Sequence, residues 1–166
     1  MEFMKKFAKV AGYIVFALYI ILLLYLTLFW SIRSAWSELS IIEYAKSRSN
    51  FVPFKSIMMY IKMYRYGITS VPIINLFGNF LMFVPMGVFL PTLFNKLKNF
   101  FASMGVTFIF LAFIEITQIL TRRGSFDIDD LILNMLGAVV GFLIHFIVRA
   151  VNKSKEGRAK EDENIG

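Results

Sequence analysis

One carboxylate lies inside a stretch of sequence that is otherwise apolar enough to cross a membrane. Glu115 falls within the run Phe100–Leu120, and Gln118 follows three residues later on the same face of the expected helix. An ionisable group inside the bilayer is costly, so such a residue points to function. The chemistry open to Glu115 is proton transfer or metal ligation. The alternative is a structural ion pair with Arg122 or Arg123, beyond the helix end.

Asparagines supply the polar groups of two other apolar runs. Asn75 and Asn79 are four residues apart, so they share one helix face, and Asn134 lies one turn inside the last run. Within a membrane, amide side chains either hydrogen-bond between helices or orient a polar ligand. The sequence leaves both interpretations open.

Further carboxylates precede the last apolar run. Asp127, Asp130 and Asn134 follow a spacing of three and four residues, which places them on one helix face. Together with Glu115 they are hard oxygen donors of the kind that Mg²⁺ or Ca²⁺ prefers. Alternatively, Asp127 or Asp129 caps the helix, since a carboxylate at a helix N-terminus is favoured by the free N–H groups and the dipole.

The composition excludes several classes of protein. Hydrophobic residues make up 58% of the chain and phenylalanine occurs 19 times, more than a soluble domain of 166 residues could bury. There is no cysteine, so disulfides and cysteine-ligated zinc are excluded. The net charge of +7 comes from short basic clusters beside apolar runs, a placement typical of membrane topology signals and of contacts with anionic lipids rather than of nucleic-acid binding.

Runs long enough to span a bilayer occur at residues 10–30, 73–94, 100–120 and 131–151. They predict an all-α, multi-pass membrane protein whose single domain covers residues 1–151. Between the first two runs, Ser56–Tyr66 has the pattern of a helix lying in the membrane interface. Residues 152–166 form a highly charged tail that we expect to be disordered.

The four spans would place both termini on one side, which the Lys and Arg of the short flanks assign to the cytoplasm. Asn79 and Glu115 then both lie roughly 8 Å below the outer boundary. Gly137 and Gly141 form a small-xxx-small pattern that allows close helix contact. The sequence therefore predicts a polar pocket opening outward. His145, far from this pocket, is expected to be packed and hydrogen-bonded.

Four stretches of the chain match a known family. They are Asn50-Phe-Val-Pro-Phe-Lys-Ser-Ile, Asn75-Leu-Phe-Gly-Asn79 continuing to Gly87, Glu115-Ile-Thr-Gln118, and Arg123-Gly-Ser-Phe-Asp-Ile-Asp-Asp130 continuing to Gly137. Their order and spacing resemble those of VanZ-like membrane proteins. The resemblance implies a bacterial plasma-membrane protein that lowers susceptibility to teicoplanin, a lipoglycopeptide acting on cell-wall precursors. Many family members occur without a resistance cluster, so this task is not implied for each.

The first hypothesis is a site that binds or modifies an envelope lipid, a lipid-linked wall precursor or a lipoglycopeptide. Proton or metal chemistry would fall to Glu115, Asp127 and Asp130. Ligand contacts would come from Arg48, Asn50, Asn75, Asn79, Gln118, Arg122, Arg123 and Asn134. No metal ligand and no cofactor is assigned, and the oligomeric state stays open. The rival hypotheses are a non-catalytic scaffold or access-modifying protein, and a small proton-coupled transporter.

Overall fold

The computed structural model describes residues 2–29 and 39–165. Within these ranges the chain is built from α-helices and one short 3-10 helix. The helices are α1 (Glu2–Leu28), α2 (Ile41–Arg48), α3 (Lys55–Arg65), α4 (Ser70–Leu93), α5 (Phe100–Leu120) and α6 (Ile128–Ile165). The 3-10 helix η1 (Asn95–Leu97) joins α4 to α5. The all-α prediction is confirmed.

Among the described residues, four helices are long and apolar enough to cross a membrane, at Lys6–Leu28, Ser70–Leu93, Phe100–Leu120 and Ile128–Lys155. They correspond to the four expected spans, although Trp30, the expected end of the first, lies outside the described residues. Much of their apolar surface is exposed, as in Leu18, Phe77 and Ile109. Such a surface needs lipid around it, so the chain is a multi-pass membrane protein.

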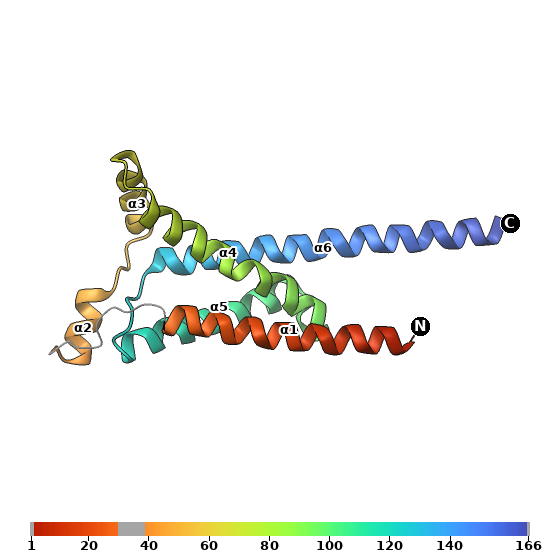
Figure 1. Cartoon of the computed structure of the whole chain (residues 1–166), viewed down its shortest axis with the longest axis horizontal. Coiled ribbons are helices and arrows are strands. Elements are labelled where there is room, and N and C mark those ends of the chain that lie inside the picture. The colour runs from red at the N-terminus through yellow and green to blue at the C-terminus, as the bar shows by residue number, and fades with distance from the viewer. Residues whose placement is uncertain (1, 30–38, 166) are drawn as a thin grey trace.

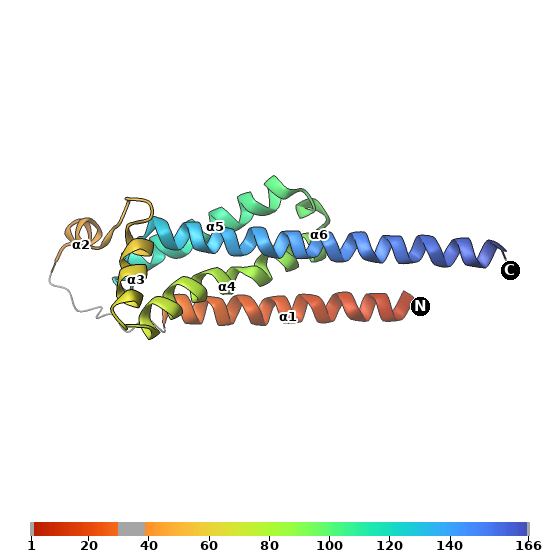
Figure 2. The same ribbon diagram turned by 90° about the horizontal axis from the view of Figure 1, so that it is seen from above.

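The four spans alternate in direction, which places both chain termini at the same end of the bundle (Figures 1 and 2). We call this the termini end. At the opposite end, the loop end, lie α2, α3 and the turn between α5 and α6 (Figure 1). Helix α3 lies across the bundle axis there and corresponds to the expected interfacial helix at Ser56–Tyr66.

Helices α4 and α6 form the closest pair in the bundle. A side chain at Gly137 would overlap the carbonyl oxygen of Phe80, and one at Gly141 would overlap that of Val84. On the other helix, a side chain at Gly87 would meet the backbone of Ala138. The predicted small-xxx-small contact is therefore confirmed. It brings the polar residues of α4 and α6 to one interface.

Helix α6 extends well past the other spans at the termini end (Figure 2). It continues without a break to Ile165. The expected disorder of residues 152–166 is therefore wrong for all of this stretch except Gly166, which lies outside the described residues. The tail is rich in Lys, Glu and Arg, which are good helix formers. A helix that is already nucleated in the membrane can therefore extend through the tail.

Candidate functional site

The loop before α3 pairs with the loop before α6 through backbone hydrogen bonds. The Asn50 N–H donates to the Phe126 carbonyl at 2.8 Å, and the Ile128 N–H donates to the Asn50 carbonyl at 3.0 Å. The Asn50 side chain adds a bond to Asp127 Oδ1 at 3.0 Å. Asn50 and Asp127 are therefore brought together, as members of a joint between two loops.

Asp127 is the capping residue of α6. Its Oδ1 accepts the Asp129 N–H at 2.9 Å, and its Oδ2 accepts the hydroxyl of Ser56. One of the two roles that the sequence allowed, a cap for the last span, is thereby confirmed.

Asp129 caps α3, whose bonded backbone groups lie 72 to 75 positions earlier in the chain. Its carboxylate accepts the N–H groups of Phe54 at 2.5 Å, Ser56 at 2.7 Å and Ile57 at 3.1 Å. These groups converge because Phe54 has left-handed backbone torsions, with φ of 64°. Only 1% of Asp129 is exposed. A buried carboxylate with three donors at a helix N-terminus is strongly stabilised, so Asp129 fixes α3 against α6.

The sequence predicts Asp129 only as a possible cap for its own helix. The Asp-rich stretch signals a helix start, but nothing in it identifies a second helix as the recipient. A pairing between residues 73 positions apart depends on how the chain returns through the membrane, and local spacing does not contain that information.

A cavity of about 380 Å³ opens beside these loops, and we call it the loop-end cavity. It is lined by Leu26, Thr27, Ile74, Asn75, Gly78, Asn79, Met82, Gln118, Gly124, Ser125 and Asp130. Four helices contribute to it, namely α1, α4, α5 and α6. Four of the residues expected to form a site, Asn75, Asn79, Gln118 and Asp130, therefore share one cavity.

The polar groups of this cavity are positioned by bonds to neighbouring helices. Asn79 donates to Asp130 Oδ1 at 2.5 Å, joining α4 to α6. Gln118 donates to the Thr27 carbonyl at 2.8 Å, joining α5 to α1. The Asn75 amide nitrogen donates to the Val71 carbonyl of its own helix at 2.8 Å. Its carbonyl oxygen then remains to accept a hydrogen bond from a ligand.

Glu115 and Asn134 lie in the protein interior and do not line the cavity. Glu115 is 4% exposed and Asn134 is 6% exposed. Among the described residues, Glu115 Oε2 and Asn134 Oδ1 have no hydrogen-bond partner. Glu115 is close enough to Asp130 and Asp127 for their charges to interact with it. Buried polar atoms without partners are rare and costly, so both side chains call for an explanation beyond packing.

The structure does not bring the three candidate arginines into the loop-end cavity. Arg48 is exposed at the end of α2. Arg122 forms the turn after α5 with φ of 55°, and its carbonyl accepts the Tyr44 hydroxyl at 3.0 Å. The Arg123 guanidinium lies 4.9 Å from the centroid of the Phe29 ring, a cation–π geometry.

The described residues contain no group of three or more Asp, Glu, His or Cys side chains placed to hold a metal ion. Asp127 and Asp129 direct their oxygens at protein donors, and Asp130 accepts from Asn79. The carboxylates that spacing placed on one face are thus divided among different partners. The geometry favours a site built from hydrogen-bonding groups.

Fold and cavity together define a class: a small helical membrane protein with an amide- and carboxylate-lined cavity at the loop end of its bundle. Residues 16–149 match the model of the VanZ/LLP1 family, and the chain belongs to this family. The resemblance found in the sequence motifs is thereby confirmed. Comparison with curated proteins and with solved structures gave no match.

Proposed function

We propose that the loop-end cavity binds the polar part of a cell-envelope molecule, either a lipid-linked wall precursor or a lipoglycopeptide such as teicoplanin. Binding there would lower susceptibility to such compounds. The proposal places the protein in the bacterial plasma membrane with both termini in the cytoplasm, so that the cavity faces the exoplasmic side. The main support for this proposal is the cavity, whose wall contains four of the predicted site residues.

The charge of the cavity favours a particular kind of ligand. Asp130 is the one ionisable residue among those that line it, and Asn75, Asn79 and Gln118 add amides. Carboxylate and amide oxygens accept hydrogen bonds, so they suit the hydroxyls of a sugar, the N–H groups of a peptide or an amine. A phosphate would meet Asp130 with no Lys or Arg in the wall. We therefore assign the sugar or peptide part of the ligand to this cavity.

The apolar part of the cavity wall offers a surface for the lipid tail of such a ligand. Leu26, Ile74 and Met82 line the same cavity as the amides, and Ile74 is 69% exposed on the outer surface of α4. A ligand with a sugar or peptide head and a hydrocarbon chain could place the head among the amides and the chain along α4. Lipid-linked precursors and lipoglycopeptides both have this construction.

Binding is favoured over catalysis because of the position of Glu115. A general acid or base must reach the atom it protonates, within about 3 Å or through one water. Glu115 is buried outside the wall of the cavity, with Asp130 in the wall and close enough for their charges to interact. We propose that Glu115 adjusts the charge and hydrogen bonding of Asp130, so that it acts as a positioning residue.

The test is teicoplanin susceptibility in a bacterial strain that expresses the protein and lacks any other VanZ-family gene, with the wall-precursor lipids profiled in parallel. Asn75→Ala removes one hydrogen-bonding group from the cavity and should weaken ligand binding by up to about tenfold. Asn95→Ala is the matched control, because Asn95 is exposed in η1, away from this cavity. Equal effects of the two variants would contradict the proposal.

Glu115→Gln preserves size and removes the ionisable group. We expect it to abolish the change in susceptibility while the amount of protein in the membrane stays normal. Accumulation of one precursor lipid on deletion of the gene would instead favour an enzyme. If variants in the cavity leave the susceptibility effect intact while variants in α3 remove it, the result would favour an access-modifying protein.

A further inference from the structure

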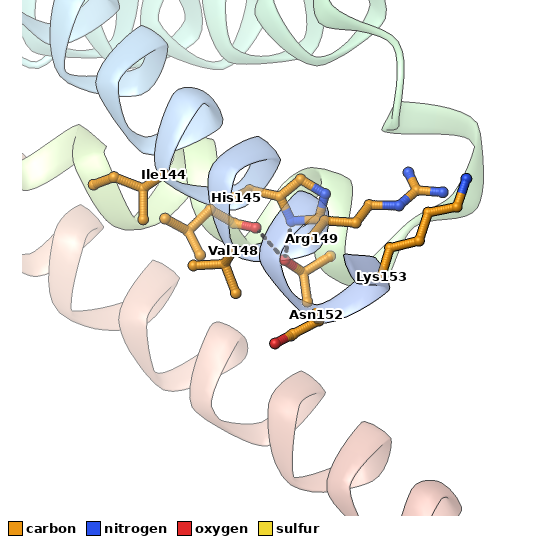
Figure 3. Close-up of a pocket in the computed structure, with 8 residues that line it drawn as sticks. Ile144, His145, Val148, Arg149, Asn152 and Lys153 are labelled. Atoms are coloured by element: carbon orange, nitrogen blue, oxygen red, sulfur yellow. Dashed lines mark hydrogen bonds between the residues drawn. The ribbon is translucent and has the colours of Figure 1, made fainter. Parts of the chain in front are cut away.

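A second cavity lies between α4 and α6 at the termini end, and we call it the termini-end cavity. Its volume is about 590 Å³, and it is lined by Val88, Thr92, Ile144, His145, Val148, Arg149, Asn152 and Lys153 (Figure 3). From the sequence, His145 was expected to be packed and hydrogen-bonded, and the basic clusters beside the spans were expected to act as topology signals and to contact anionic lipids in general. Their common cavity suggests more than that.

His145 is held in a defined orientation by Thr92. The Thr92 hydroxyl donates its proton to the Val88 carbonyl at 2.6 Å. The contact of 2.8 Å between Thr92 Oγ1 and His145 Nδ1 is therefore donated by the histidine. The expected hydrogen bond of His145 is confirmed. With Nδ1 engaged, Nε2 is the ring nitrogen left for other partners.

Basic residues form a stripe along this side of α6. His145, Arg149 and Lys153 are spaced by four residues and so share one helix face. Lys98, after η1, is also close enough to His145 for their charges to interact. Figure 3 shows the side chains of Arg149 and Lys153 extending in the same direction. None of the residues that line this cavity is acidic. The cavity therefore attracts anions.

We propose that the termini-end cavity binds the phosphate group of an anionic phospholipid. The Arg149 guanidinium offers two parallel N–H donors to a phosphate, Lys153 adds a point charge, and Asn152 adds an amide donor. Basic pockets between membrane helices are a recurrent site for such headgroups. This proposal is independent of the loop-end cavity and of its ligand.

Free phosphate has the same chemistry as the headgroup of a lipid, but the apolar residues of the termini-end cavity favour a lipid. Val88, Ile144 and Val148 line the cavity on the membrane side of the basic residues. They offer an apolar surface to acyl chains while Arg149 and Lys153 meet the phosphate. A soluble ion would leave that apolar surface unused.

The experiment reconstitutes the full chain in nanodiscs of phosphatidylcholine and phosphatidylglycerol and measures by native mass spectrometry which lipid stays bound. We expect phosphatidylglycerol to be retained preferentially. In the double variant Arg149→Gln/Lys153→Gln its retention should fall at least about tenfold. Both side chains are exposed, so the variant should fold, and circular dichroism checks that it does.

The matched control is Lys155→Gln/Arg158→Gln, which removes the same charge from the same helix outside the cavity lining. It should leave retention within about twofold of the unchanged protein. Equal losses of lipid retention in the two double variants would show that basic residues attract anionic lipids in general and that no specific site exists. This result would overturn the proposal. Displacement of the lipid by millimolar inorganic phosphate would overturn it too, because the ligand would then be a soluble ion.

Discussion

The two ends of the α4–α6 pair present opposite chemistry. At the loop end the cavity wall contains Asp130 and three amides, and no Lys or Arg. At the termini end it contains His145, Arg149 and Lys153, and no acid. Helices α4 and α6 thus contribute to both cavities: with α1 and α5 they form an acceptor-rich cavity at the loop end, and by themselves they form a donor-rich cavity at the termini end.

The two ends also differ in how firmly their side chains are held. At the loop end Asp127 and Asp129 bind backbone and side-chain donors from the loop before α3, and Asn79 bonds to Asp130 across helices. At the termini end Thr92 and His145 form the one interhelical side-chain bond described for the cavity lining. A ligand at the loop end meets a fixed arrangement, whereas one at the termini end meets long, exposed side chains that adapt to it.

The largest effect is expected from a change that disturbs both ends together. In Gly141→Ala the new methyl group would overlap the Val84 backbone, so α4 and α6 must separate. We expect a loss of about 3 kcal/mol or more in the free energy of unfolding, the upper range for overpacking against backbone. Unfolding in detergent measures it, and both ligand readouts should fail.

The control for this change is Gly105→Ala. Gly105 is also helical, but the space around it is open. Alanine is the better helix former, so this variant should be neutral or more stable by up to about 1 kcal/mol. A stable Gly141→Ala protein would show that the two cavities do not depend on one close helix contact.

Asp129→Asn should disturb the loop end alone. The variant loses the charge that three backbone N–H groups share and places an NH₂ group against some of them. We expect a loss of about 2 kcal/mol, measured as faster hydrogen exchange of the amides of Ser56 and Ile57. Glu43→Gln makes the same chemical change on the exposed surface of α2 and should leave these amides protected.

The control measurement for Asp129→Asn is the retention of phosphatidylglycerol at the termini end. It should be unchanged in this variant, since none of the affected groups lines that cavity. Loss of phosphatidylglycerol there would mean that the two ends are coupled.

Double-mutant cycles should distinguish the interhelical bonds of the two ends. For Asn79→Leu with Asp130→Leu we expect a coupling of about 1 kcal/mol, within the range for such bonds in membrane proteins. For Thr92→Val with His145→Phe we expect about half of that, because Thr92 is exposed. A stronger coupling at the termini end would reverse the comparison.

The smallest effect concerns α2, which lines neither cavity. Glu43 accepts from the Ser40 hydroxyl at 2.7 Å and from its N–H at 3.0 Å, and these bonds lower the pKa of Glu43 below its usual 4.5. Their contribution is therefore complete above about pH 4.5 and is lost as the pH falls through the lowered pKa. Amide exchange in α2 should rise in that acid range. Ser40→Ala should already show the rise at neutral pH.

Much of the fold could be predicted because each span carries its own apolar pattern. The four runs, the helix across the loop end and the contact of Gly137 and Gly141 all followed from local spacing. Helix rise and alternation of direction predicted that Asn79 and Glu115 lie at a similar depth. Helix α2 was not predicted as a separate helix, since it is only eight residues long and its start depends on a capping box at Ser40.

The side-chain partners could not be predicted in the same way. Asp129 binds the start of α3, and Glu115 is buried outside the cavity that it was expected to line. The Thr92–His145 pair joins residues 53 positions apart, and Thr92 carries no signal in the sequence. Spacing along a helix fixes which residues share a face. The rotation of each helix against its neighbours decides what that face meets, and this depends on packing over the whole bundle.

The unbroken length of α6 has a mechanical consequence. Its 38 residues make a rod of about 57 Å, nearly twice the hydrocarbon thickness. One end is anchored at Asp127 and Asp129, and the close contact at Gly141 lies less than halfway along. If α6 tilted by about 5° around that contact, Ile165 would be displaced by about 3 Å. Small rearrangements near α3 would in this way reach the opposite side of the membrane as a lever movement, without any hinge in between.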